Sequence, residues 1–420
     1  MSLFYSFVIL LLRIGIRLAS LFNPKARAFV HGRKMLFKQL YDSFNKNITP
    51  VVWFHCASLG EFEQGRPIIE LLKKEYPNHK ILLTFFSPSG YEIRKNYALA
   101  DFVFYLPWDT ASHARKFIGI TKPVLAIFVK YEFWLHFAKE IHKKNIPLLS
   151  ISSIFRPNQI FFQRYGKFFR SILKNFSHFF VQNDESVRLL KSIGIQECTR
   201  AGDTRFDRVM TISHQEISLQ TIECFKNNVQ TWVIGSCWPE DLDVLLPYIN
   251  ESEGKLKFII APHEISETVL SDIERGLEVR SVRYSKAAEN QGDYTVLLID
   301  NIGMLSKLYR FGEFAFVGGA FGKGLHNILE AACYGIPVFF GNKNYEKFQE
   351  AKDLMMRGGA FEVADYADFK KKYELLMSRP ENYLLACEVT TQYVQENLGA
   401  TEVIMQYCRK LLGNPYLSHK

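Results

Sequence analysis

The sequence lacks the features of a disulfide-stabilised, zinc-binding or repeat protein. Its seven cysteines are scattered, odd in number and form no C-x-x-C pair, which argues against a disulfide framework and a zinc site. It has no low-complexity tract and no repeat with a period of about 20 to 50 residues, which excludes solenoid arrays. A reducing, cytoplasmic setting is the simplest interpretation of this cysteine usage.

The apolar run near the N-terminus is too short for an ordinary membrane span. Residues 3–12 (LFYSFVILLL) are apolar, but Arg13 and Arg17 interrupt the segment before it reaches the roughly 20 residues of a transmembrane helix. No Lys or Arg precedes the run and no small-x-small cleavage site follows it, so a cleaved signal peptide is not expected. We expect an uncleaved amphipathic helix in the inner leaflet, with the rest of the chain in the cytoplasm by the positive-inside rule. A surface helix packed on the protein's own core is the alternative.

Length and charge narrow the class of protein. A chain of 420 residues predicts two or three domains, and 48% hydrophobic with 23% charged residues is typical of a globular protein. The formal net charge of +9 favours a polyanionic partner, the candidates being nucleic acid, an anionic membrane surface and a phosphorylated substrate. Nucleic acid fits least well, because the basic residues gather near the apolar N-terminal segment and no nucleic-acid-binding motif is present.

From Val51 onward, short β-rich runs alternate with helical patterns, as in parallel sheets with crossover helices. The strand candidates are VVWFHCA, KILLTFFS, FVFYLP, PVLAIFVK, PLLSISSI and HFFVQN in the first half, and TWVIGSC, KFIIAPH, TVLLID, EFAFVGG and PVFFG in the second. This predicts an α/β chain with two tandem doubly wound, Rossmann-like domains and a ligand cleft at the carboxyl ends of their strands. We place a membrane-associated segment at 1–34, the first domain at 35–209, a linker at 210–229, and the second domain with C-terminal helices at 230–420. The last helix could instead return to the first domain.

The stretch HCASLGEFEQGRP, residues 55–67, joins a predicted strand to a predicted helix. Ser58 and Glu61 have the spacing of an S-x-x-E capping box, in which the serine caps the helix and the glutamate accepts from the N–H of the cap residue. A carboxylate in this turn is also a candidate general base. Capping is the commoner role for such a pair, so the spacing alone leaves both roles open.

The segment FVGGAFGKGLHNILEAACYGIPV, residues 316–338, runs from a buried strand through a glycine-rich loop into a helix expected to open at the His-Asn pair. Gly318 and Gly319 would let the backbone approach a ligand closely, and the helix N-terminus would offer free N–H groups to a phosphate. The loop is neither a Walker loop nor a strict G-x-G-x-x-G. Asn327 and Glu330 also fit a capping box, but the glycines, the His-Asn pair and the glutamate together favour nucleotide binding.

Two further strand ends are expected to face the same ligand. APHE, residues 261–264, places His263 after KFII, and DNIGML, residues 300–305, places a tight turn after TVLL; a lone histidine is more often structural than a ligand. Asp241 and Asp243 form a D-x-D, the pattern that holds a divalent metal in one class of sugar transferases. They lie in a predicted amphipathic helix with the acids facing solvent, so we predict no metal and no cofactor.

Together these segments resemble the 3-deoxy-D-manno-octulosonic acid (Kdo) transferases of lipid A assembly. HCASLGEFEQGRPII, VKYEFWLHF, GDTRFD, APHE, IDNIGML and GGAFGKGLHNILEAACYGIPV occur in that family's order, from about residue 3 to about residue 360. The resemblance implies the glycosyltransferase-B architecture and inverting transfer from the donor CMP-Kdo to a lipid A precursor of the lipid IVA type. It also implies that no metal is needed, and that the protein sits on the cytoplasmic face of the inner membrane in lipopolysaccharide biosynthesis.

The resemblance assigns roles to particular residues. It makes Glu61 the general base and gives Glu132, the second acid of the family's E-x-E-L-W motif, a role at the acceptor side, while Lys130 replaces the first acid. The acceptor side would also include Ser58, Gly60 and Arg66. The donor positions, of which the last two would hold the CMP ribose and phosphate region, are Pro262, His263, Gly303, Met304, Gly318, Gly319, Asn327 and Glu330.

One tension concerns the basicity of Glu61. The dipole at a helix N-terminus lowers the pKa of a carboxylate, which weakens it as a base. Desolvation by an apolar wall, for which Phe62 and Leu59 are available, would act in the opposite direction.

Two other interpretations stay open. A transferase or epimerase of the same fold would use a uridine nucleotide sugar, which competition between CMP and UMP would distinguish. A non-catalytic peripheral membrane protein would bind the nucleotide without turnover. The partners that the resemblance and the charge predict are CMP-Kdo, a lipid A precursor and the anionic inner-membrane surface, without nucleic acid.

Overall fold

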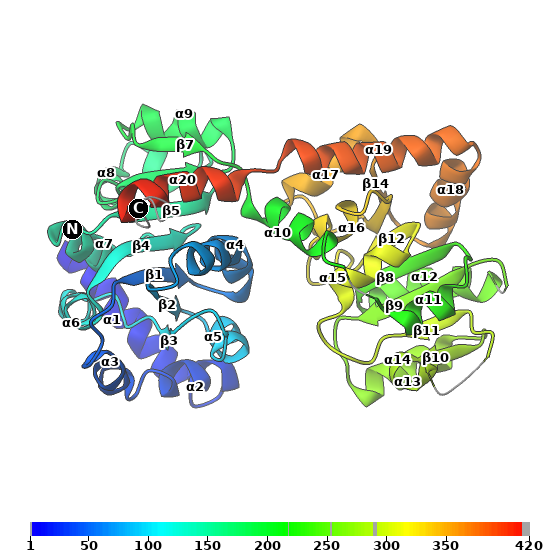
Figure 1. Ribbon diagram of the computed structural model, residues 1–420, viewed down its shortest axis with the longest axis horizontal. Helices are drawn as coiled ribbons and strands as arrows, with labels where there is room; N and C mark the ends of the chain where they lie inside the picture. Colours follow the sequence, from blue (N-terminus) through cyan, green and yellow to red (C-terminus); the bar gives the residue numbers. More distant parts are fainter. Residues whose placement is uncertain (1, 217, 253, 289–291, 414–420) are drawn as a thin grey trace, which may run out of the picture. The chain divides into compact units, whose positions relative to one another are not determined.

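The chain divides into two compact units. The computed structural model describes residues 2–216, 218–252, 254–288 and 292–413. The first unit runs to Arg208 and resumes at Leu398, and the second unit comprises residues 209–397 (Figure 1). The stretch expected as a linker, 210–229, contains the end of helix α10 (Thr204–Ser213) and helix α11 (Gln220–Lys226). The last helix, α20 (Ala400–Leu412), lies in the first unit.

Each unit is built on a seven-stranded parallel sheet, which confirms the predicted α/β class with two Rossmann-like domains in tandem. The first sheet has the order β3 (Phe102–Tyr105), β2 (Lys80–Phe85), β1 (Val51–Cys56), β4 (Pro123–Val129), β5 (Leu148–Ser153), β6 (His178–Val181) and β7 (Cys198–Arg200). The second has the order β10 (Ser281–Arg283), β11 (Val296–Leu298), β9 (Lys257–Pro262), β8 (Thr231–Cys237), β12 (Phe314–Val317), β13 (Val338–Gly341) and β14 (Ala360–Val363). Each strand candidate corresponds to one of these strands, whereas the edge strands β7, β10 and β14 were not predicted.

Helices connect the strands in both units (Figure 1). Those of the first unit are α1 (Ser2–Ala19), α2 (Pro24–His31), α3 (Leu36–Phe44), α4 (Leu59–Glu75), α5 (Pro88–Arg94), α6 (Ala111–Thr121), α7 (Leu135–Lys143), α8 (Lys167–Leu173), α9 (Asp184–Ser192) and α20, with a 3-10 turn at Ile160–Phe162. Besides α11, those of the second unit are α12 (Pro239–Glu251), α13 (Glu267–Gly276), α14 (Tyr284–Ala287), α15 (Leu305–Leu308), α16 (Leu329–Ala332), α17 (Gln349–Arg357), α18 (Tyr366–Met377) and α19 (Pro380–Glu396), with a 3-10 turn at Tyr309–Phe311.

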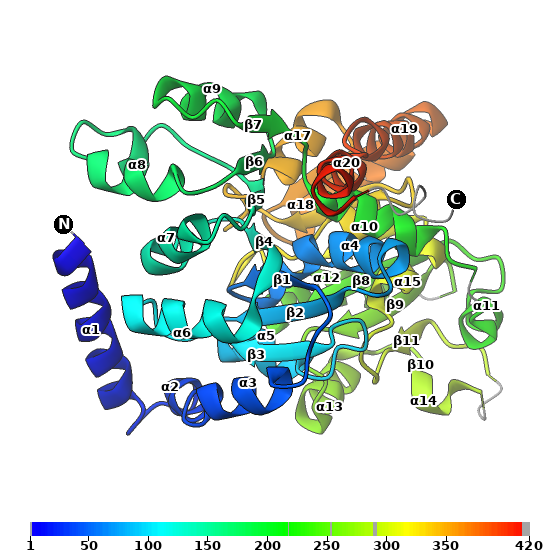
Figure 2. The same cartoon turned by 60° about the vertical axis from the view of Figure 1, so that its left-hand side comes forward.

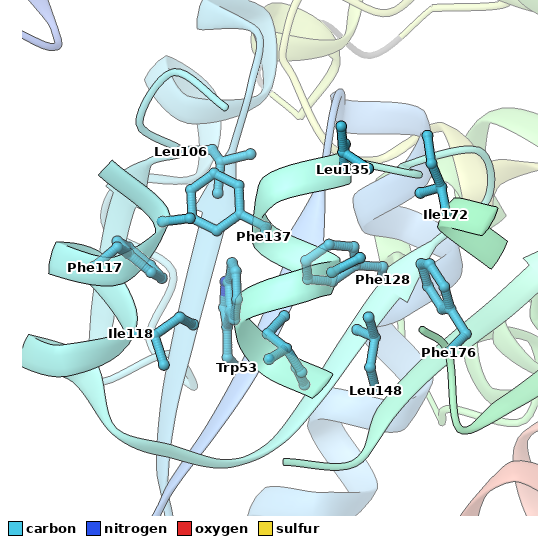
Figure 3. Packing of buried hydrophobic residues seen from close by; sticks show 14 of the residues in the cluster. Trp53, Leu106, Phe117, Ile118, Phe128, Leu135, Phe137, Leu148, Ile172 and Phe176 are labelled. Atoms are coloured by element: carbon cyan, nitrogen blue, oxygen red, sulfur yellow. The ribbon is translucent and has the colours of Figure 1, made fainter. Parts of the chain in front are cut away.

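Strand β1 explains why helices cover both faces of the first sheet. All six of its residues are buried, and successive side chains point to opposite faces. Trp53 packs on one face against Phe117 and Phe128, with ring centroids 4.8 and 4.9 Å apart (Figure 3). Phe54 belongs to the cluster on the other face, with Phe62 of α4. A strand that is apolar on both sides needs helices on both sides.

Helix α20 completes the second of these faces. Asp207 accepts hydrogen bonds from the backbone N–H groups of Gly399 and Thr401 at 2.7 and 2.6 Å, which satisfies free donors at the start of the helix. Arg409 pairs with Glu75 of α4 at 2.7 Å. These contacts attach α20 to the first unit.

Helix α1 lies outside the core of the first unit (Figure 2). Ile9 is its one buried residue, and large side chains such as Leu3 and Phe4 are 86% and 67% exposed. The Tyr5 hydroxyl donates to Asp109 at 2.6 Å, which ties the helix to the unit. Among the described residues, α1 is the helix that is long and apolar enough, by length and composition, to cross a membrane, with a mean hydropathy of 1.8. The expectation that the apolar run is too short for a span is therefore wrong by these two criteria, because the helix continues past Arg13 and Arg17 to Ala19. Its wide apolar face is therefore not part of the core.

Candidate active site

The carboxyl ends of β1 and β4 lie side by side at the point where the strand order of the first sheet reverses. The two strands are neighbours, and the chain continues from β1 to β2 on one side and from β4 to β5 on the other. Ligands of doubly wound sheets bind at such a switch point. Glu61 follows β1 and Glu132 follows β4. The sheet therefore brings together two acids that are far apart in the sequence.

The turn after β1 is a helix cap. Ser58 is the extended N-cap residue of α4, and its backbone N–H donates to Glu61 Oε2 at 2.9 Å. Gly60 is exposed, and a Cβ added there would have no atom within 4 Å, so the turn does not require glycine at this position. Glu61 thus has the capping role that its spacing predicts, and one of its oxygens is used for it.

Capping does not make Glu61 a weak base. Burial raises the pKa of this carboxyl above its usual value, and the neighbouring Glu132 raises it further. The N–H of Ser58, the His55 ring and the positive charge of Lys130 oppose this rise in the pKa of Glu61 without cancelling it. Desolvation therefore outweighs the helix start, and Glu61 binds a proton more strongly than an exposed glutamate does.

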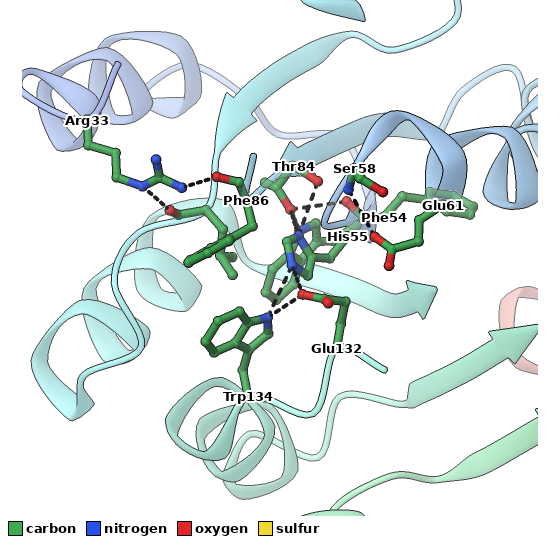
Figure 4. Close-up of polar contacts among 11 residues, drawn as sticks. Arg33, Phe54, His55, Ser58, Glu61, Thr84, Phe86, Glu132 and Trp134 are labelled. Atoms are coloured by element: carbon green, nitrogen blue, oxygen red, sulfur yellow. Dashed lines mark hydrogen bonds and ion pairs between the residues drawn. The ribbon is translucent and has the colours of Figure 1, made fainter. Parts of the chain in front are cut away.

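Glu132 is held by two ring nitrogens. Trp134 Nε1 donates to Glu132 Oε2 at 2.7 Å, and His55 Nε2 lies 2.9 Å from the same oxygen (Figure 4). The side chain of Glu132 is 11% exposed and that of His55 is fully buried. Lys130, the residue in the place of the first acid, directly follows β4 and has a left-handed backbone, φ 59°. The second acid of the motif therefore lies beside Glu61.

Arg66 is occupied by acids of its own helix. Its Nε donates to Glu70 at 2.8 Å, and Nη1 reaches Glu63 at 3.5 Å. Asp203 of the GDTRFD segment is also bound internally, because it accepts from the side-chain amide of Gln64 at 3.1 Å and from Arg205 at 2.9 Å. These contacts stabilise the first unit, and they do not bring Arg66 to Glu61.

The second sheet has its own switch point, between β8 and β12. Gly318 follows β12, and a Cβ at this position would lie 2.5 Å from Ser236 O and 2.6 Å from Asp241 Oδ2. Gly319 has φ +94°, and its Cβ would lie 2.5 Å from Gly324 O. Both positions therefore require glycine. The backbone of the loop is packed tightly against the start of α12.

The prediction that Asp241 faces solvent is wrong. Asp241 is buried in the first turn of α12, where Oδ2 accepts from the backbone N–H groups of Trp238 and Gly319, each at 2.8 Å. The free N–H at the helix start and the N–H of the loop turn the carboxylate inward. Burial raises the pKa of Asp241 to about 6. Asp243 is exposed, as the helical pattern predicts.

Aromatic rings surround the end of β9. Pro262 ends this strand, and the ring of His263 stacks on Trp238 and on His326 at centroid distances of 4.4 and 4.6 Å. Trp238 Nε1 donates to His326 Nε2 at 3.2 Å. Burial and the neighbouring His263 lower the pKa of His326 to about 4, so His326 is neutral at pH 7. Lys323 adds a positive charge, with Nζ 4.2 Å from the Trp238 ring centre.

The helix expected at the His-Asn pair begins later and is short. Helix α16 starts at Leu329 and has four residues. A helix this short has only a small dipole, so its N-terminus would attract a phosphate less than the sequence predicts. Asn327 Oδ1 accepts from Leu329 N at 3.3 Å, and Asn327 Nδ2 donates to Glu330 at 3.2 Å. Gly303, with φ +92°, forms the predicted tight turn before Met304, the N-cap of α15.

Comparisons with known proteins show which proteins this chain is similar to. Residues 31–208 match the model of the 3-deoxy-D-manno-octulosonic-acid transferase (kdotransferase) family. A 3-deoxy-D-manno-octulosonic acid transferase from Rickettsia felis is 28% identical over 374 residues, which is 86% of this chain and 79% of the relative. One from Aquifex aeolicus is 29% identical over 340 residues, 79% of this chain and 88% of the relative. The chain is a glycosyltransferase related to the Kdo transferases.

A solved structure supports the architecture of this glycosyltransferase. The UDP-GlcNAc 2-epimerase of Neisseria meningitidis, solved with UDP-GlcNAc bound, has a TM-score of 0.59 and 16% identity, and the match covers 86% of this chain and 100% of that one. At this identity the likeness concerns the fold alone. The glycosyltransferase has the two-domain glycosyltransferase-B architecture that the resemblance implied.

Two residues of the candidate site in this glycosyltransferase were not found from the sequence: His55 and Trp134. His55 stands at the carboxyl end of an apolar strand, where a polar residue is a usable signal. Trp134 lies inside a segment that carries the resemblance. His326 belongs to the His-Asn pair that the sequence does point to. Among the described residues, no group of three or more His, Cys, Asp or Glu side chains could hold a metal ion.

Proposed function

We propose that this glycosyltransferase moves Kdo from CMP-Kdo to a lipid A precursor of the lipid IVA type, with inversion at the anomeric carbon. The observation that carries the proposal is the state of Glu61. One of its oxygens caps α4, while burial raises the pKa of the carboxyl, so the same residue can cap the helix and accept a proton. The sugar is taken from the names of the relatives.

In the proposed reaction, Glu61 accepts the proton of the acceptor hydroxyl. The hydroxyl oxygen bonds to the anomeric carbon of Kdo, while the bond from that carbon to the phosphate oxygen breaks and CMP leaves with the electron pair. General-base catalysis of this kind contributes about 10²- to 10⁴-fold to a rate. Glu132 would accept a hydrogen bond from the acceptor beside Glu61.

On the donor side, we assign the phosphate to the loop at Gly318 and Gly319, next to His263. Asn327 and Glu330 would hold the CMP ribose and phosphate region. The neighbouring histidine rings support this assignment. A phosphate placed there would favour the protonated form of the histidines, because a nearby anion stabilises the charged ring.

We propose that α1 attaches the protein to the cytoplasmic face of the inner membrane. Its exposed apolar side chains, among them Leu3 and Phe4, support this location, because an apolar helix face with no partner in the core is stable in a lipid interface. The basic residues that follow, such as Arg27, would meet the anionic lipid headgroups.

The test is Glu61→Gln, with Glu63→Gln on the same helix as the matched control. Glutamine also accepts the N–H of an N-cap, so α4 should keep its first turn. We expect transfer from CMP-Kdo to a lipid A precursor, measured by mass spectrometry, to fall by about 10²- to 10⁴-fold while CMP-Kdo still binds. Glu63 pairs with Arg94 at 2.9 Å and lies outside the proposed chemistry, so its variant should remain active.

Other outcomes would favour the other interpretations. Near-normal transfer by a folded Glu61→Gln protein would leave Glu61 with the capping role alone. Stronger competition by UMP than by CMP would favour a uridine nucleotide sugar. Binding of CMP-Kdo by wild-type protein without any transfer would favour the non-catalytic interpretation.

A further inference from the structure

A buried hydrogen-bond chain leads from the core of the first sheet to the Glu132 carboxylate (Figure 4). Trp53 Nε1 donates to Thr84 Oγ1 at 2.8 Å, and the same hydroxyl lies 2.9 Å from His55 Nδ1. On the other side of the ring, His55 Nε2 lies 2.9 Å from Glu132 Oε2. Trp134 Nε1 donates to that same oxygen at 2.7 Å. The imidazole is therefore held at both of its nitrogens.

The contact between His55 Nε2 and Glu132 Oε2 requires a proton. Trp134 Nε1 lies 2.7 Å from Glu132 Oε2 and 3.2 Å from His55 Nε2, and its single N–H cannot satisfy both atoms. Two unprotonated acceptors 2.9 Å apart would also repel each other in this buried site. Because Glu132 Oε2 already accepts from Trp134, it acts as the anionic acceptor of two donors. We therefore assign the proton to His55 Nε2. The other oxygen of Glu132, Oε1, has no hydrogen-bond partner among the residues that the structure describes.

We propose that His55 is a positioning residue that holds Glu132 in place beside Glu61, with Trp134 as the second donor. Both donors engage Oε2, which leaves Oε1 available to the acceptor hydroxyl. This inference rests on the proposed function, since it needs Glu61 to be the base. Glu132 is one of the groups that raise the pKa of Glu61, so a displaced Glu132 would also weaken the base.

A double-mutant cycle tests whether His55 acts through Glu132. We expect His55→Leu and Glu132→Gln each to lower kcat by about 10- to 100-fold, since a misplaced group of this kind costs up to about 10²-fold, with an unchanged KM for CMP-Kdo. Because both changes affect one unit, the double variant should be at most about twofold slower than the slower single variant. Losses that multiply, or a His55→Leu protein with normal kcat, would overturn the proposal.

Two further variants distinguish a loss of positioning from a loss of folding. Trp134→Phe removes the second donor at a half-buried position, and its smaller loss should also vanish in the Glu132→Gln background. His55→Gln restores a donor toward Glu132, so its kcat should lie within a few-fold of wild type. A His55→Gln protein as slow as His55→Leu would contradict the positioning role.

A spectroscopic readout separates this inference from the proposed function. In the full chain labelled with ¹⁵N-histidine, His55 should show a slowly exchanging proton on Nε2, and Glu132→Gln should shift its resonance. An unprotonated Nε2 in the wild-type protein overturns the inference whatever the activity. A protonated Nε2 that responds to Glu132→Gln, in a protein that transfers no Kdo, would support the hydrogen bond and refute the proposed function alone.

Discussion

Replacing Asp241 by Asn should stabilise the protein relative to wild type at neutral pH. This gain in the free energy of unfolding should disappear in acid, where Asp241 is protonated in both the folded and the unfolded chain. The carboxylate is buried, Oδ2 accepts from the N–H groups of Trp238 and Gly319, and Oδ1 has no hydrogen-bond partner among the described residues. Burial holds its pKa at about 6, against an ordinary value of 3.8. Asn can present its carbonyl oxygen to the same two N–H groups without carrying a charge.

Proton binding by Asp241 sets the direction and the size of the change in the free energy of unfolding with pH. Between about pH 4 and pH 6 the folded chain keeps the Asp241 proton that the unfolded chain has released, so the free energy of unfolding falls as the pH rises through this window. A gap of about 2 pH units at about 1.4 kcal/mol each corresponds to about 3 kcal/mol. The advantage of Asp241→Asn over wild type should therefore grow by about 3 kcal/mol from pH 4 to pH 6.5 and then stay level.

Urea titrations at four pH values between 4 and 7 would measure this difference, and hydrogen exchange of the amides of β8 and β12 would assign it to the second unit. Asp243→Asn is the matched control, because Asp243 is exposed on the same helix and carries no burial cost. A difference between Asp241→Asn and wild type that does not change with pH would refute the reasoning. So would a difference that shrinks as the pH rises.

Two more predictions concern the donor and the membrane. Glu330→Ala, which removes the acceptor of Asn327, should weaken CMP binding by about 1 to 3 kcal/mol in calorimetry, the cost of losing a hydrogen bond to a charged partner; a purely structural role predicts lower stability with unchanged affinity. Removing residues 2–22 should move the protein from membranes to the soluble fraction with CMP affinity retained, because the proposed nucleotide site lies in the other unit. Retention on membranes in high salt would contradict the role of α1.

The sequence predicts all the central strands and the edge strand β3, whose residues FVFY are all apolar. Runs such as VVWFHCA are buried on both faces and therefore nearly continuous in apolar residues. The three strands that were missed, β7, β10 and β14, all lie at sheet edges and have three or four residues. These three edge strands contain polar or charged residues, so their sequences lack the continuous apolar run that marks a central strand and that the edge strand β3 retains.

The sequence predicts the local contacts of the candidate site but not the contacts between distant segments. The Ser58 to Glu61 spacing identifies the cap from local sequence, because both partners lie within one turn. The contact of His55 with Glu132 depends on the pairing of β1 with β4, which local patterns do not contain. Asp241 was misread for a related reason: its helix has Trp238 in place of Ser or Thr at the N-cap, so the capping spacing was present without its usual first residue.

Glu61 and Asp241 occupy equivalent positions in the two units. Each is the third residue of the helix that follows the first strand of its sheet. Burial raises the pKa of both carboxyls. Their free oxygens differ: Oδ1 of Asp241 is buried without a partner, whereas Glu61 is partly exposed and uses one oxygen for a single N–H. A base must reach the proton that it abstracts. Position in the fold and pKa therefore do not distinguish the two acids. Solvent access does, and it is consistent with the proposed role of Glu61 as the base and with a supporting role of Asp241 in the loop.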